Sequence, residues 1–265
     1  DKIQLPPLGQ QAENRVVGAP CGLMDQLSSY LGREDHLLPI ICQPAKVFGP
    51  VPIPEDLQFI GIDSGVKHRV SGRQYSRART AAFMGYSIIL QHLGISREFM
   101  ENADTEALPF QGYLANIEKV QFQEDFQQLL PVSMPGEEFL RRYGSVIDPV
   151  TNIHPEEKYP IRACTAHPVF ENDRINLFMQ ALKQVNQNNE NRHLFKQMGL
   201  WMYESHQGYS DCGLGRQQTD FLVENLKSMG ADKGIYGARI SGGGCGGTVV
   251  VMLEKKQSSA AIQRI

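Results

Sequence analysis

The sequence has few of the features that mark membrane, secreted or nucleic-acid-binding proteins. No apolar run in its 265 residues reaches the roughly 18 that a membrane span needs, and the N-terminus lacks the apolar core of a signal peptide. The 26 basic residues nearly offset the 29 acidic ones, and no Lys/Arg block suited to a phosphate backbone occurs. We therefore expect a cytoplasmic protein that binds neither membranes nor nucleic acid.

Cysteine is also scarce. The five cysteines are odd in number and widely scattered, and none has the paired spacing of a zinc site or a redox motif. We expect free thiols, and we predict no residue as a metal ligand. Internal repeats are absent as well, while the 41% hydrophobic content is typical of a globular protein with one large domain or two small ones.

Hydrophobic periodicity predicts the elements of the first third of the chain. A short helix is expected to begin near Gly22 and to stop at Gly32. Residues 37–45 and 58–66 have the pattern of strands, and the spacing of small and apolar residues from Tyr75 to Gly94 predicts a helix. This switch from strand to helix predicts a domain boundary, with one domain at residues 1–74 and a second at 75–265.

The second domain is predicted to be rich in helices. Residues 173–185 and 193–209 are apolar with helical period, and a further helix is expected to begin at a Thr219 cap and to end at Gly230. Residues 236–254 then predict a strand, a glycine loop and another strand. Because strands and helices do not alternate steadily, the pattern indicates an α+β fold class.

The glycine run itself is the strongest local signal for a binding site. Five glycines lie between Gly242 and Gly247, and such a run is normally kept where the backbone needs positive φ or must approach a ligand closely. The run leads into a β-branched strand at Thr248, whereas Walker and Rossmann loops open helices. Two interpretations remain open: a nest of backbone N–H groups that binds an anion, and a hairpin or bulge without a ligand.

Two polar positions could accompany this loop. Asp25 is expected in the first turn of its helix, where it either stabilises the helix start or orients the proton of an attacking hydroxyl group. Tyr75 follows a strand end together with Lys67, His68 and Arg69, and polar groups at strand ends often line pockets. A tyrosine there serves either in half-buried packing or as a hydrogen-bonding group for a substrate.

In their order along the chain, these motifs resemble the galactokinase branch of the GHMP kinase superfamily. The resemblance rests on AENRVVGAPCGLMDQ, SGVKHRVSGRQYSRAR, MYESHQGYSDCGLG with the TDFLV that follows it, and YGARISGGGCGGTVVV. Within that branch, the segments CQPA, AFMG, HPVFENDR and SDCGLG are similar to L-arabinokinase and its bacterial relatives. The matching segments extend over nearly the whole chain.

The resemblance implies a GHMP kinase fold, with residues 1–74 as an incomplete N-terminal lobe of the ribosomal S5 domain 2-like type and residues 75–265 as the C-terminal lobe. It also implies an enzyme that uses ATP and Mg²⁺ to phosphorylate the anomeric hydroxyl of a monosaccharide of the L-arabinose or galactose type. Asp25 would be the catalytic carboxylate and, with Gly22 and Tyr75, would contact the sugar. The residues expected at the nucleotide phosphates are Gly242, Gly243, Gly244, Gly246 and Gly247.

Some features depart from the family pattern. Lys67 stands where Arg is usual, and Cys245 would place a thiol beside the nucleotide. The family's Gly-Glu-His-x-Asp-like sugar motif and its Gly-x-x-x-Ser-Ser-Ser-Ala phosphate loop are not found in the sequence. We therefore expect a fragment of a longer kinase that is inactive alone and that self-associates through exposed apolar surface. The alternatives are a non-catalytic sugar or nucleotide sensor on the same fold, and a GHMP enzyme acting on a non-sugar alcohol or phosphorylated isoprenoid.

Overall fold

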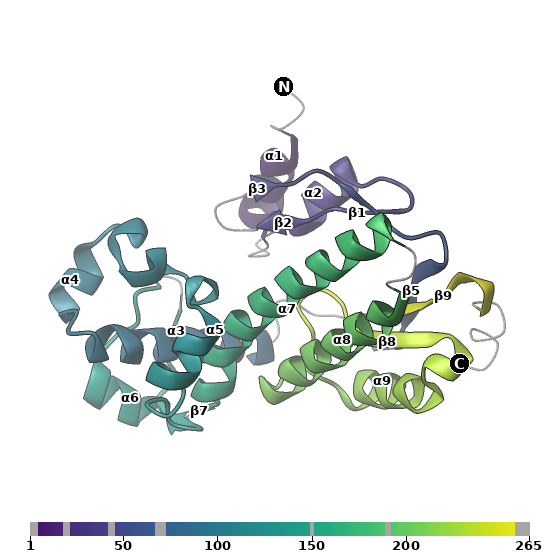
Figure 1. The fold of residues 1–265 in the computed structure, drawn as a ribbon. Coiled ribbons are helices and arrows are strands. Elements are labelled where there is room, and N and C mark those ends of the chain that lie inside the picture. The colour runs from purple at the N-terminus through teal and green to yellow at the C-terminus, as the bar shows by residue number, and fades with distance from the viewer. Residues whose placement is uncertain are drawn as a thin grey trace.

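The computed structural model describes residues 5–17, 22–41, 46–66, 73–148, 151–188 and 192–257. In Figure 1 the first elements of the chain lie above the long helix α7, and the remaining elements form the larger part of the molecule below. We call the described residues of 5–56 the N-terminal segment and those of 57–257 the body. The N-terminal segment contains α1 (Leu5–Ala12), η1 (Glu13–Val17), α2 (Met24–Leu31), β1 (His36–Leu37), β2 (Ile40–Ile41), β3 (Lys46–Val47) and β4 (Val51–Pro52).

A three-stranded antiparallel sheet in the order β5-β9-β8 organises the body. Strand β5 (Leu57–Asp63) pairs with β9 (Thr248–Glu254) along its whole length, and β8 (Ile235–Ile240) pairs with the other edge of β9. Successive side chains of a strand point to opposite faces of a sheet. On β9, Val249 and Val251 accordingly pack with α9, while Val250 and Met252 pack toward α7 and α8. The central strand is therefore covered on both faces.

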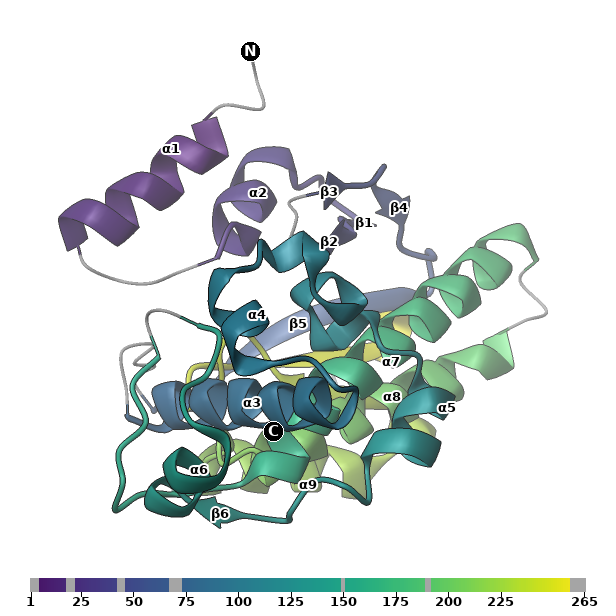
Figure 2. The same cartoon turned by 90° about the vertical axis from the view of Figure 1, so that its left-hand side faces the viewer.

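Helices make up most of the rest of the body, and Figure 2 shows α3 in front of α7 and α8. The three that surround the sheet are α7 (Ile161–Gln187), α8 (Leu194–Asp211) and α9 (Gln217–Met229). A Cβ atom on Gly199 of α8 would lie 1.8 Å from the carbonyl oxygen of Tyr236, so only glycine permits this approach of α8 to β8. The other elements of the body are α3 (Arg73–His92), α4 (Arg97–Asn102), η2 (Thr105–Ala107), η3 (Pro109–Gly112), η4 (Leu114–Asn116), α5 (Lys119–Gln121), η5 (Phe122–Phe126), β6 (Met134–Pro135), α6 (Gly136–Tyr143), β7 (Lys158–Tyr159), η7 (Ala231–Lys233) and η8 (Lys255–Gln257).

The largest core of the body lies where α3 crosses α7. Its buried members include Met84 and Ile89 of α3, Phe122 and Phe126 of η5, and Cys164 of α7. Aromatic side chains of this size contribute most of the buried apolar area of such a core. The crossing of α3 and α7 is thus held mainly by hydrophobic packing.

Several sequence predictions are confirmed by these elements. The helix that stops at Gly32 is α2, the helix expected from Tyr75 is α3, and the strand–loop–strand unit is β8 and β9. The α+β fold class is confirmed as well. The domain boundary at residue 74 stays a prediction, although β5 lies before it and pairs with β9, which lies after it.

Three predictions differ from the structure. In place of one strand, residues 37–41 contain the last residue of β1 and the whole of β2, with Leu38 and Pro39 between them. Residues 42–45 lie outside the described part. Helix α9 begins at Gln217, and Thr219 lies in its first turn, where its hydroxyl accepts a hydrogen bond from the backbone N–H of Arg216. Helix α7 begins well before residue 173 and continues through Pro168, because packing against α3 compensates the hydrogen bond that proline cannot donate.

Among the described residues, no helix has the length and apolarity that crossing a bilayer requires. Cys164, Cys212 and Cys245 are free thiols, as expected. Cys21 and Cys42 lie outside the described residues.

Candidate active site

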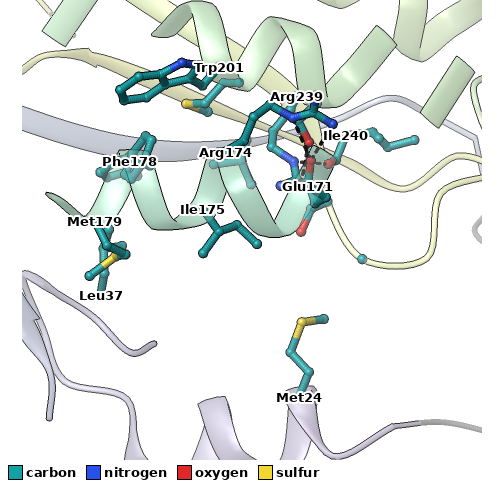
Figure 3. Close-up of a pocket in the computed structure, with 16 residues that line it drawn as sticks. Met24, Leu37, Glu171, Arg174, Ile175, Phe178, Met179, Trp201, Arg239 and Ile240 are labelled. Atoms are coloured by element: carbon teal, nitrogen blue, oxygen red, sulfur yellow. Dashed lines mark hydrogen bonds and ion pairs between the residues drawn. The ribbon is translucent and has the colours of Figure 1, made fainter. Parts of the chain in front are cut away.

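A cavity of about 340 Å³ lies between the N-terminal segment and the body. Met24, the first residue of α2, forms one wall, and Ile175 and Phe178 of α7 form another. In Figure 3 the side chain of Met24 points across the gap toward α7. Gly242, the first glycine of the run, also lines the cavity. The cavity therefore joins the start of α2 to the glycine loop, which are far apart in the sequence.

The cavity has an apolar part and a polar part. Phe178, Met179 and Trp201 lie together, and Glu171 and Arg239 lie at the other side near the loop (Figure 3). Such a mixture of apolar walls and a few convergent polar groups is typical of small-molecule sites.

The polar part is an ion-paired cluster of largely buried side chains. Oε1 of Glu171 lies 2.7 Å from Nη1 of Arg239, and Oε2 lies 3.1 Å from Nη2 of Arg174. The Ser205 hydroxyl donates a hydrogen bond to Oε1 at 2.6 Å. Burial alone would raise the pKa of Glu171, but Arg239 and the Ser205 hydroxyl hold it below its usual value. Because two guanidinium groups face one carboxylate, the three side chains together carry an excess positive charge.

The glycine loop takes the backbone conformation that its sequence predicts. Gly242, Gly244, Gly246 and Gly247 have φ values of 65°, 80°, 119° and 82°, and Cys245 joins them at 64°. Gly243 does not have a positive φ. These angles are accessible to glycine at little cost and are unfavourable for a β-branched residue. The prediction of positive φ is therefore confirmed at four of the five glycines.

Two backbone N–H groups of the loop already have partners within the protein. The N–H of Cys245 donates to the carbonyl of Leu214 at 2.6 Å, and that of Gly247 donates to the carbonyl of Val66 at 2.8 Å. At Gly242, by contrast, no atom lies within 4 Å of the position that a Cβ would take. The open part of the loop is thus its first turn, at the cavity.

Cys245 does not present its thiol to the solvent. Its side chain is buried in the core where α3 crosses α7, and burial raises its pKa. The positive φ at this non-glycine position is held by the hydrogen bond to Leu214.

Asp25 lies in the first turn of α2, as the sequence predicts, and is exposed. Its carboxylate makes no hydrogen bond or ion pair with another residue in the described part of the chain. Gly22 precedes the helix and is also exposed. Asp25 is not one of the residues that line the cavity; its link to the cavity is its sequence neighbour Met24.

Tyr75 lies at the start of α3, half-buried against the core where α3 crosses α7. Burial raises the pKa of Tyr209, and the nearby Tyr75 adds to that rise. The hydroxyl of Tyr209 donates a hydrogen bond to the carbonyl of Gly242 at 2.8 Å. Tyr75 and the glycine loop are therefore both neighbours of Tyr209. Lys67, His68 and Arg69 lie outside the described residues.

Sequence reasoning did not predict roles for Glu171, Arg174 and Arg239. Glu171 and Arg174 lie three residues apart on one face of α7, within the quoted segment HPVFENDR. Arg239 is the second-last residue of β8, the strand that leads into the glycine loop. An acid and a base at this helical spacing are more often a solvated ion pair than part of a site. Only the fold shows that they line the cavity.

Comparison with known proteins gives consistent matches. Residues 179–265 match the model of the GHMP kinases C-terminal family. The chain is 36% identical to L-arabinokinase of Arabidopsis thaliana, over 95% of this chain and 26% of that protein. It is 31% identical to galactokinase of Actinobacillus succinogenes, over 97% of this chain and 53% of that protein. The chain thus spans about half the length of the galactokinase and about a quarter of the L-arabinokinase.

The fold matches a solved structure as well. The crystal structure of Lactococcus lactis galactokinase complexed with galactose has a TM-score of 0.68 and 17% identity, over 99% of this chain and 54% of that chain. At that identity the match shows the fold. The chain therefore has the fold of about half of a galactokinase, contains a GHMP kinase C-terminal domain at residues 179–265, and is a homologue of L-arabinokinase and the galactokinases.

Proposed function

We propose that this chain carries part of an ATP-dependent sugar kinase that phosphorylates the anomeric hydroxyl of a monosaccharide of the L-arabinose or galactose type. The observation that carries the proposal is the cavity shared by Met24, the neighbour of Asp25, and Gly242 of the glycine loop. The cavity supports the proposal because the residue next to the carboxylate candidate and the first residue of the phosphate-loop candidate both line it. The homologous sugar kinases support the same reaction class.

In this proposal Asp25 accepts or orients the proton of the attacking hydroxyl group. Asp25 is exposed in the first turn of α2, where its carboxylate is accessible to an attacking hydroxyl group. Gly22 and Tyr75 contact the sugar. The reaction requires little covalent help from the protein, so positioning and electrostatic stabilisation supply most of the rate enhancement.

The residues at the loop suit the phosphates of ATP. The first turn of the loop is open at Gly242, and the ion-paired cluster beside it has an excess positive charge. The proposed phosphate site consists of Gly242, Gly243, Gly244, Gly246 and Gly247. Its most accessible part is the turn at Gly242, since the N–H of Gly247 already donates to the carbonyl of Val66. Within the described ranges, no three His, Cys, Asp or Glu side chains converge as metal ligands, so we assign no residue of this chain to Mg²⁺, which would be carried by the nucleotide. We further propose a cytoplasmic location and self-association.

The experiment is a substrate screen with the full-length protein. ADP release is measured with L-arabinose, galactose and glucuronate, and thermal shift is measured with each sugar and an ATP analogue. We expect turnover with L-arabinose or galactose. Stabilisation by sugar and nucleotide without ADP release would favour a non-catalytic sensor, and ADP release with glucuronate alone would contradict the proposed substrate class.

A further inference from the structure

One tyrosine contacts the glycine loop at two points. The hydroxyl of Tyr209, on α8, donates to the carbonyl of Gly242 at 2.8 Å. Its ring lies beneath the next turn, because a Cβ on Gly244 would be 3.1 Å from its Cδ1. Since burial raises the pKa of Tyr209, its hydroxyl keeps the proton that this hydrogen bond needs. Tyr209 therefore fixes the open first turn of the loop from below.

Arg239 orients this tyrosine. Its guanidinium carbon lies 5.4 Å from the centroid of the Tyr209 ring, and its Nε donates to the carbonyl of Ile240 at 3.1 Å. The same group pairs with Glu171 of α7. A planar guanidinium can satisfy these partners at once, whereas the ammonium of lysine cannot. The contacts form a continuous path from α7 through β8 to α8 and the loop.

The ion-paired cluster is shielded from solvent, so its contacts contribute to holding the loop. The side chains of Glu171 and Arg239 are only 15% and 26% exposed. Ion pairs at a fully exposed surface contribute little, but a pair this buried is costly to break because the remaining charge lacks a partner. The cluster also lies close to the loop in sequence, because only two residues separate Arg239 from Gly242, the first glycine of the loop.

We infer that Tyr209 and Arg239 are positioning residues that hold the first turn of the glycine loop in a conformation ready to receive phosphate. The inference rests on the proposed function, since it takes the loop as the phosphate-contacting element. In this inference the ion-paired cluster orients the loop. Tyr209 and Arg239 therefore have a different role from the residues proposed to contact the sugar.

The test compares two tyrosines of α8 in the full-length protein. Tyr209→Phe removes the donor to Gly242 and keeps the ring, and we expect a rise of about five-fold in the KM for ATP with little change in the KM for the sugar. Tyr203→Phe is the matched control, because the hydroxyl of Tyr203 is buried without a hydrogen-bond partner among the described residues. It should leave both KM values unchanged. Arg239→Lys should raise the KM for ATP about ten-fold or more.

Hydrogen exchange of the amides of residues 241–247 gives a second measurement that does not need activity. We expect faster exchange in Tyr209→Phe and Arg239→Lys than in wild type and Tyr203→Phe. If Tyr209→Phe and Arg239→Lys only lower the melting temperature, with KM and loop exchange unchanged, the positioning role is wrong and the proposed function stands. If the wild type phosphorylates no sugar, the proposed function fails, and unchanged loop exchange in Tyr209→Phe would then overturn the positioning role independently.

Discussion

Asp25 and the glycine loop lie on parts of the molecule that differ in how they are held. In the N-terminal segment, the buried residues among those described are Pro6 and Leu27, and each strand has two residues. In the body, β5 and β9 pair over their full length, and the loop leads directly into β9, which is covered on both faces. The carboxylate candidate is thus carried by a lightly packed element and the loop candidate by a densely packed one.

The two parts nevertheless touch at defined points. Leu37, Val51 and Ile53 of the N-terminal segment pack against the core formed with α7 and α8. The side-chain amide of Asn186 on α7 also donates to the carbonyl of Pro52 at 2.8 Å. From this difference in packing we expect substitutions at Asp25 to change the catalytic rate without changing stability. Substitutions in the loop should change both the activity and the stability.

The largest effect is expected for Asp25→Asn. Removing the carboxylate takes away the group proposed to handle the proton, and we expect kcat of the full-length protein to fall about a hundred-fold or more. Because Asp25 is exposed, the melting temperature should stay within about 1 °C of wild type. Steady-state kinetics and differential scanning fluorimetry measure the two quantities.

The control for this variant is Glu34→Gln, which removes another exposed carboxylate from the N-terminal segment. It should leave kcat unchanged. Near-normal kcat in Asp25→Asn would contradict the catalytic assignment and leave Asp25 as a residue that stabilises the helix start.

The next largest effect concerns Gly246→Ala. A Cβ there would lie 2.8 Å from Cγ1 and 2.9 Å from the carbonyl oxygen of Val66, at a φ of 119°. Backbone strain and overpacking together should lower the free energy of unfolding by about 4 kcal/mol, and ATP affinity should fall with it. Urea unfolding and nucleotide titration check both expectations.

Gly94→Ala separates the two contributions to this loss. Gly94 has a φ of 81° at the end of α3, but no atom lies within 4 Å of its Cβ position. Its substitution should cost only the backbone strain, about 1 kcal/mol, with ATP affinity unchanged. An equal loss of stability in the two variants would show that the loop is not tightly held against Val66.

The last expected effect is a dependence of the free energy of unfolding on pH, and its source lies in the body. Burial lowers the pKa of His167, on α7, from 6.5 to about 4, with Arg174 and Arg239 adding to the decrease and Glu171 opposing it. Between pH 6.5 and pH 4 the unfolded chain therefore binds a proton that the folded protein does not. Stability should fall as the pH falls through this range, by at most about 3 kcal/mol from this group.

His167→Gln should flatten this dependence. Urea unfolding is followed by the fluorescence of Trp201, the single tryptophan of the chain, which lies on α8 in the body. The slope of unfolding free energy against pH should be smaller in the variant between pH 4 and 6.5, and the two proteins should have the same slope above pH 7. An unchanged slope would show that other groups carry the acid sensitivity.

Local patterns predicted the elements that carry the candidate site. The glycine run and the β-branched residues after it predicted the β8–β9 unit, and Gly32 and Gly94 marked the ends of α2 and α3. Each signal depends on residues close in sequence, which is why it could be recognised without the fold. The part of α7 before residue 173 had no such local signal: it contains Pro168, which is unfavourable inside a helix, and it packs against α3.

The sequence alone determined the fold class, the positive φ of most of the loop glycines and the place of Asp25 in the first turn of its helix, since these follow from local backbone preferences and motif order. The tertiary structure alone decided that Met24 and Gly242 share a cavity, that Glu171 pairs with Arg239 and that Tyr209 holds Gly242. Tyr209 and Gly242 are 33 positions apart, Glu171 and Arg239 are 68 apart, and Met24 and Gly242 are farther apart still. Such pairings have no local signal, because they arise only when the sheet and its helices pack together and bring distant side chains within hydrogen-bonding distance.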